Sequence, residues 1–189
     1  NTEKGFVDYD MTHKMIVDIC DTANNNQVKM IDVDSVLNVL NLNPWITKAE
    51  ADINLNEYLD VVITECEPVT RVYNNKGESV YIDIEGNIFP SDNQYVPRLL
   101  VVSGIDFQTA DLGNVNDDIY AKTKLPQAFN LIKEVLNDNY AKDCVKQIYY
   151  DKKKNYIFSV NNTNIIVIFG DVNNIKEKSY NLKELEDEQ

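Results

Sequence analysis

The side chains that could carry out chemistry are few and widely spaced in this sequence. The only histidine, His13, lies on a predicted helix with no nucleophile motif nearby. A single histidine in such a place usually has a structural role, because acid–base catalysis needs a partner group within hydrogen-bond reach. The chain also lacks the patterns G-x-S-x-G, H-E-x-x-H and G-x-x-x-x-G-K-[ST], which mark hydrolase, zinc-protease and phosphate-binding sites. We therefore predict no enzymatic activity and no catalytic residues.

Candidate metal ligands are equally uninformative. The cysteines, Cys20, Cys66 and Cys144, stand far apart without a C-x-x-C pair. Their spacing does not suit zinc, and an odd number cannot pair completely into disulfides. We interpret them as buried free thiols, because cysteine packs as a small hydrophobic residue. The acidic residues at 32–34 are explained by helix capping, and the run 111–118 lacks the mid-loop glycine and final glutamate of a calcium loop. We predict no metal and no cofactor.

Composition excludes further classes of function. The 189 residues carry a formal net charge of −13, from 31 acidic and 18 basic side chains. Such a charge repels phosphate backbones, so nucleic acid is not an expected partner. A hydrophobic share of 43% with 11 tyrosines supports folded cores rather than disorder. The sequence contains no apolar run near the roughly 20 residues that span a bilayer. Because it starts at Asn1, we expect it to be a fragment of a longer protein.

The first third of the sequence predicts two helices followed by two strands. Apolar residues recur with helical spacing in Met11–Cys20. A second short helix is expected to start with Asp34 as its N-cap and to end before Pro44, which lacks an amide hydrogen. Alternating patterns then predict strands in Ile46–Leu55 and Tyr58–Glu65, joined as a hairpin.

The rest of the sequence predicts a larger sheet with helices. The turns between its strands are rich in asparagine and glycine, which favour tight reversals. Gly104 is expected to end one strand, and residues 105–120 are expected to form a polar loop. A helix is predicted in Leu125–Leu136, and a closing helix is predicted to begin near Asn174. The expected strands are Val69–Tyr73, Ser79–Ile84, Ile88–Phe89, Leu99–Ser103, Val145–Tyr150, Asn155–Val160 and Asn164–Phe169.

The last of these strands stands out because it is apolar on both faces. Ile165–Phe169 contains five consecutive apolar residues. Such a strand is either covered on both sides or presents one face to a partner.

Four segments resemble motifs of the FtsQ/DivIB family of bacterial cell-division proteins, most closely its Bacteroidetes-type members. They are the helix end and following strand around Asn43-Pro44-Trp45-Ile46, the crossing segment Ile63–Val72, the hairpin Tyr81–Pro90 and the strand Pro97–Gly104. They occur in the family's order over about 70 residues. We identify the chain as a suspected extracytoplasmic region of such a protein.

The resemblance implies an α+β fold with two domains. Residues 1–66 are expected to be a POTRA (polypeptide-transport-associated) domain of βααββ order, with its first strand lying outside this chain. Residues 67–189 are expected to be the family's β domain, a mixed or antiparallel sheet with flanking helices, without its final strand. Structural roles are expected for the motif residues Pro44, Trp45, Pro68, Arg71, Gly86 and Gly104, with Arg71 pairing across the domain junction.

The resemblance also implies a function. Family members are single-pass inner-membrane proteins whose two domains lie on the periplasmic side at the division septum. They have no enzymatic activity; they hold FtsB and FtsL and link them to other divisome proteins, including the septal peptidoglycan synthase complex. FtsB adds a strand to an exposed sheet edge near the C-terminal end. We therefore expect partner contacts in Asn164, Ile165, Ile166, Val167, Ile168 and Phe169.

Two alternatives remain open from the sequence. One is a POTRA-containing component of outer-membrane assembly or secretion, which tandem POTRA units or a following barrel would favour. The other is an enzyme with an unrecognised site, which a deep pocket lined by convergent polar groups would favour.

Overall fold

The computed structural model describes residues 5–22, 32–91, 95–110, 112–160 and 166–171. The chain divides into two compact units. Unit 1 comprises Asn1–Cys66 and Asp92–Val96, and unit 2 comprises Glu67–Ser91 and Pro97–Gln189. Both units combine helices with sheet, which confirms the predicted α+β class. No helix in the described parts of the chain has the length and apolar character needed to cross a membrane.

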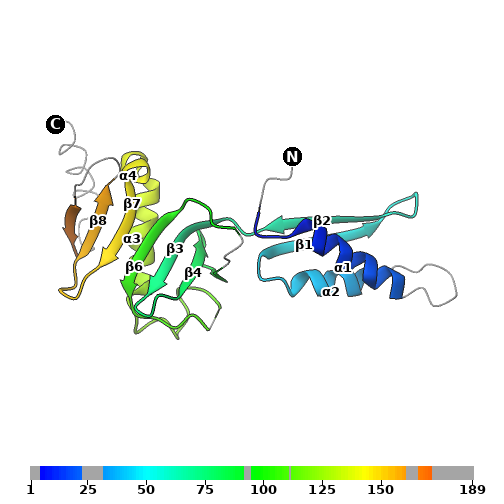
Figure 1. Ribbon diagram of the computed structural model, residues 1–189, viewed down its shortest axis with the longest axis horizontal. Coiled ribbons are helices and arrows are strands. Elements are labelled where there is room, and N and C mark those ends of the chain that lie inside the picture. The colour runs from blue at the N-terminus through cyan, green and yellow to red at the C-terminus, as the bar shows by residue number, and fades with distance from the viewer. Residues whose placement is uncertain (1–4, 23–31, 92–94, 111, 161–165, 172–189) are drawn as a thin grey trace. The chain divides into compact units, whose positions relative to one another are not determined.

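Unit 1 consists of two helices that lie against a two-stranded antiparallel sheet (Figure 1). Its elements follow the predicted order: α1 (Tyr9–Thr22), α2 (Val33–Asn41), β1 (Ile46–Ile53) and β2 (Leu59–Glu65). The N-cap of α2 is Asp32, whose carboxylate accepts hydrogen bonds from the backbone N–H of Ser35 at 3.2 Å and from its hydroxyl at 2.6 Å. The predicted cap, Asp34, lies in the first turn instead, because a cap must precede the helical residues.

The core of unit 1 forms around Trp45. Its ring is buried and stacks on Phe6, with ring centroids 3.9 Å apart and planes 3° apart. Val36 and Leu40 of α2 are buried as well. Pro44 is exposed, just beyond the end of α2, where it stops the helix as predicted.

Unit 2 is built on a seven-stranded mixed sheet in the order β5-β4-β3-β6-β7-β8-β9. Strand β6 pairs in parallel with β3 and β7, and all other pairs are antiparallel. The strands are β3 (Pro68–Asn74), β4 (Ser79–Asp83), β5 (Ile88–Pro90), β6 (Leu100–Ile105), β7 (Val145–Tyr150), β8 (Tyr156–Val160) and β9 (Ile166–Gly170). Its helices among the described residues are α3 (Leu125–Asn137) and α4 (Asn139–Cys144).

Helix α3 covers one face of this sheet and forms the main core (Figure 1). Its apolar side, including Phe129 and Ile132, packs with inward residues of the central strands such as Val72 and Val102. Burial of each such side chain contributes about 1.5–3 kcal/mol. The segment predicted to be a polar loop adds further core residues, namely Ile105, Phe107, Val115 and Tyr120.

Helix α4 was not predicted. It has only six residues, too few to show a helical period. Its N-cap Asp138 accepts hydrogen bonds from the backbone N–H groups of Tyr140 and Ala141. This short capped helix follows α3 directly and leads into β7.

Four hairpin turns share one design. In each, an Asn or Asp side-chain oxygen accepts the backbone N–H of the residue four positions later, and the residue three positions later has a positive φ. The sequence predicts glycine for such a backbone, because other residues are strained there. Two of the turns use other residues instead. The positive-φ positions are Glu57 (64°), Gly77 (83°), Gly86 (90°) and Lys154 (67°).

Gly104 lies inside β6 rather than at its end, which corrects the prediction. Its φ is +84°, and the pairing of β6 with β3 shifts register at this point. A Cβ atom here would lie 2.2 Å from the carbonyl oxygen of Tyr150 in the neighbouring strand β7. The glycine therefore permits a close approach of two backbones in a bulged strand.

Other sequence predictions agree with the structure only in part. None of the three cysteines forms a disulfide, but only Cys66 is buried, whereas Cys20 and Cys144 are half-buried. The expectation of buried thiols is therefore wrong for two of the three. The closing helix near Asn174 lies outside the described residues.

Candidate functional site

The candidate site is β9, which is an outermost strand of the described sheet. Within the described residues β9 pairs with β8 alone, with Ile168 opposite Ile157 and Ile166 opposite Ser159. In an outer strand, alternate residues direct their N–H and C=O groups away from the sheet. These groups can bond to an added strand without any reactive side chain.

The inner face of β9 is fixed to the core. Phe169 is 5% exposed and stacks on Phe158, with ring centroids 4.5 Å apart and planes 16° apart. Val167 packs against the same core. Two aromatic rings in contact add about 0.5–1.5 kcal/mol to the energy of area burial. The strand is therefore held in place from one side.

The outer face of β9 is apolar and open to solvent. Ile166 is 69% exposed and Ile168 is 71% exposed. Ile168 lies opposite the half-buried Ile157, which in turn lies opposite Tyr149 of β7. Tyr149 is 42% exposed. An apolar row next to an unpaired strand edge is typical of an interaction surface. Of the two sequence-based alternatives, the exposure of Ile166 and Ile168 among the described residues favours a strand with one open face, and its use by a partner stays a prediction.

Four of the six predicted contact residues belong to β9, namely Ile166, Val167, Ile168 and Phe169. They do not play equivalent parts. Ile166 and Ile168 face outward, whereas Val167 and Phe169 face the core. Asn164 and Ile165 lie outside the described residues.

The opposite outer strand, β5, is a much poorer docking edge. It has only three residues and ends at Pro90, which has no backbone N–H to donate. Its Ile88 and Phe89 are buried. A short strand with a proline is a recognised protection against unwanted pairing. The two ends of the sheet therefore differ in what they offer to another chain.

The remaining motif residues support the sheet of unit 2. The Nε of Arg71 donates a hydrogen bond to the hydroxyl of Ser79 at 3.1 Å. Its guanidinium carbon lies 5.0 Å from the ring centroid of Tyr73 and 5.2 Å from that of Tyr81. These cation–π contacts hold Arg71 across β3 and β4, within unit 2. The pairing that we expected from it across the domain junction stays a prediction.

Pro68 and Gly86 also occupy structural positions. Pro68 is the first residue of β3, where its missing amide is tolerated. Gly86 lies in the turn between β4 and β5 with φ of 90°. A Cβ atom there would lie 2.8 Å from Cγ2 of Val115. Gly86 thus allows the hairpin to pack closely on the segment before α3.

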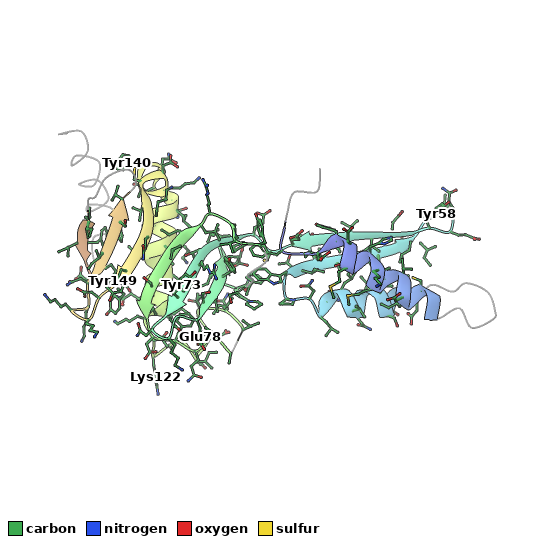
Figure 2. The ribbon with its side chains drawn as sticks, in the orientation of Figure 1. Tyr58, Tyr73, Glu78, Lys122, Tyr140 and Tyr149 are labelled. Carbon is green, nitrogen blue, oxygen red and sulfur yellow. The ribbon has the colours of Figure 1, made fainter. Side chains whose placement is uncertain are left out.

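The perturbed titratable groups are explained by local contacts. The Tyr9 hydroxyl donates to Glu65 at 2.6 Å, and this bond, with burial and the negative charge of Glu65, raises the pKa of Tyr9. Hydrogen bonds from Asn74 and Thr109 lower the pKa of Glu78 (Figure 2). Burial raises the pKa of Tyr156. None of these groups lies in β9.

Metal-binding residues do not gather in the described parts of the chain. No group of three or more His, Cys, Asp or Glu side chains there could hold a metal ion. His13 is exposed on α1. What β9 can do chemically is bind, through backbone hydrogen bonds and apolar contact.

Comparison with known proteins gives the chain a family. No curated protein matches it. The family model described as "FtsQ/DivIB, C-terminal related" matches residues 67–189, which is more than half of the chain and begins at the first residue of unit 2. The chain therefore belongs to the FtsQ/DivIB-related family of cell-division proteins.

Proposed function

We propose that the chain is a non-enzymatic adaptor of the division machinery that captures a strand of FtsB along β9. Its family gives it a role in cell division. The observation that carries the proposal is the outermost β9, anchored by Phe169 and exposing Ile166 and Ile168. FtsL and the septal peptidoglycan synthase complex are the further partners in this proposal, reached through FtsB.

The energetics suit a reversible adaptor. Each backbone hydrogen bond to an added strand contributes about 0.5–1.5 kcal/mol net. Covering an exposed isoleucine adds up to about 1.5–3 kcal/mol. Ordering the incoming peptide opposes both gains, so an affinity on the order of micromolar is expected for an isolated peptide.

The partner's side chains would select it against other strands. Backbone bonds are nearly independent of sequence, so specificity must come from alternate side chains of the added strand. Those on the outer face would lie beside Ile166 and Ile168, so apolar or β-branched residues are favoured there.

A titration with a fluorescent FtsB peptide tests the proposal. Binding to the whole chain is expected, and Ile168→Pro is expected to abolish it, because proline in the middle of β9 removes an amide and cannot continue a regular ladder. Val62→Pro in β2 of unit 1 is the matched control, since Val62 is also exposed. The proposal fails if Ile168→Pro binds as the unchanged chain does while its circular dichroism spectrum stays native.

We further propose that unit 1 is a POTRA domain and unit 2 the family's β domain. The order α1, α2, β1, β2 in unit 1 agrees with the αα-ββ part of a POTRA domain, and the family match starts where unit 2 starts. In the proposal both domains lie on the periplasmic side of the inner membrane, anchored by a helix outside this chain. Expressed in the whole natural protein, the Cys20 thiol should react with a membrane-impermeant maleimide added to cells with a permeabilised outer membrane. Labelling that requires rupture of the inner membrane would contradict it.

The family match favours division over the alternative of outer-membrane assembly. A fluorescent fusion of the natural protein should gather at the septum. An even distribution around the cell would argue for the alternative.

A further inference from the structure

A groove in unit 2, away from β9, combines an apolar floor with a basic rim. It has a volume of about 870 Å³ and lies where the parallel strands β3, β6 and β7 begin, beside the end of α3. Its floor is formed by Val69, Leu100, Val101, Val135, Leu136 and Val145. We call it the basic groove because Arg98, Lys142 and Lys146 also line it.

The charge of this groove is opposite to that of the protein. The chain carries −13, yet no Asp or Glu is among the described residues that line the groove. Arg98, Lys142 and Lys146 are all exposed. In the described part of the chain, none of the three forms a salt bridge. Their charges are therefore available to a ligand.

The three cations come from different elements. Arg98 precedes β6, Lys142 lies on α4 and Lys146 lies on β7. A single small anion would need cations that converge on one point, whereas cations from three elements beside an apolar lining suit a ligand with several carboxylates. Leu100, Val135 and Val145 of the lining are buried whereas the three cations are exposed, so the flat surface of a bilayer would not reach the floor, although a lipid headgroup would reach the cations.

We propose that the basic groove binds an acidic, amphipathic segment of a partner protein. Apolar side chains of that segment cover the half-buried Val69 and Leu136, and its carboxylates lie near Arg98, Lys142 and Lys146. The rest of the protein repels an acidic segment, so the potential directs it to this groove. The same repulsion excludes acidic segments elsewhere, which makes the site selective. This contact is separate from β9 and does not depend on strand capture there.

Selection from a displayed library of random 12-residue peptides tests this proposal on the whole chain. Peptides enriched by the unchanged protein should carry several Asp or Glu residues interspersed with apolar ones. The double variant Lys142→Glu/Lys146→Glu should weaken their binding by about tenfold or more, with a steeper loss at low salt. The matched control is Lys152→Glu/Lys153→Glu, which changes the net charge equally in an exposed turn. It should alter binding by less than about twofold.

Several outcomes would overturn the proposal. These are no enrichment, enrichment of peptides without acidic excess, or equal losses in the two double variants. Binding of phosphatidylglycerol vesicles that Lys142→Glu/Lys146→Glu abolishes would assign the groove to a membrane instead. Peptide binding only after removal of residues 182–189 would assign it to the chain's own acidic end. Ile168→Asp, which changes β9, should leave peptide binding intact, so failure of the groove and failure of strand capture are distinguishable.

Discussion

The two outer strands of the described sheet, β9 and β5, solve the same problem in opposite ways. Any outer strand has backbone groups that lack a neighbour. Strand β5 limits this with three residues, a terminal proline and buried side chains. Strand β9 has five residues and exposes two isoleucines. An exposed apolar edge promotes aggregation unless a partner covers it, so the contrast favours β9 over β5 as the proposed partner-binding edge.

Strand β6, in the middle of the sheet, is where a substitution is expected to lower stability most. Gly104→Ala in β6 is expected to lower the free energy of unfolding by about 3 kcal/mol or more, because its Cβ atom would clash with the Tyr150 carbonyl and its φ is positive. Urea unfolding followed by circular dichroism measures this. Because β6 joins the β3 side of the sheet to the β7 side, both outer strands should lose protection from hydrogen exchange together. A loss of stability below about 1 kcal/mol would mean that the two backbones can move apart to accommodate the Cβ atom.

Matched core substitutions separate stability from binding at the two ends. Phe169→Ala in β9 and Phe89→Ala in β5 each remove a buried ring. Each is expected to cost about 3 kcal/mol of stability. Only Phe169→Ala should also weaken binding of the FtsB peptide, because it releases β9 from Phe158. Calorimetric titration of each variant with the FtsB peptide, at a temperature below its unfolding midpoint, measures the affinity. Equal losses of affinity would show that peptide binding does not distinguish the two strands.

Surface substitutions test the outward face alone. Ile168→Asp should weaken FtsB-peptide binding by about tenfold or more while changing stability by less than about 0.5 kcal/mol, because Ile168 is exposed. The control is Ile84→Asp, which lies exposed in the turn before β5. It should leave binding unchanged. If Ile168→Asp binds normally, the added strand does not contact this face.

The smallest effect concerns Tyr156 in β8, the strand that supports β9. Its buried hydroxyl has no hydrogen-bond partner among the described residues, and burial raises its pKa above the ordinary value of 10.0. The fold therefore favours the neutral phenol, so this stability is fully present below pH 10 and is lost as pH rises further. Tyr156→Phe should change stability at pH 7 by at most about 1 kcal/mol. It should also reduce the loss of stability above pH 10, measured by urea unfolding at several pH values. An unchanged pH profile would show that Tyr156 does not cause the loss.

Local patterns in the sequence predicted most elements because they are local properties. The alternation in β2, the strand at Val145–Tyr150 and the proline at the start of α3 all depend on neighbouring residues. The predicted strand at Asn164–Phe169 appears as β9, an outermost strand among the described residues, and the exposure of its outer face follows from its pairing with β8. That pairing could not be read from five apolar residues in a row.

Features that depend on distant contacts were missed. The sequence predicted Gly104 to end a strand, yet the glycine is needed inside β6 because the Tyr150 carbonyl of another strand approaches it closely. Glu57 and Lys154 adopt a positive φ without being glycine, because the side-chain oxygens of Asn54 and Asp151 accept backbone N–H groups and hold their turns. The basic groove joins residues that are far apart in sequence, so no motif indicated it.

Hydrogen exchange of the whole chain with and without FtsB tests strand capture at β9 most directly. We expect the backbone amides of β9 to exchange more slowly in the complex, while those of β5 exchange at an unchanged rate. Slower exchange confined to other strands, with β9 unaffected, would contradict the proposal that β9 receives the partner.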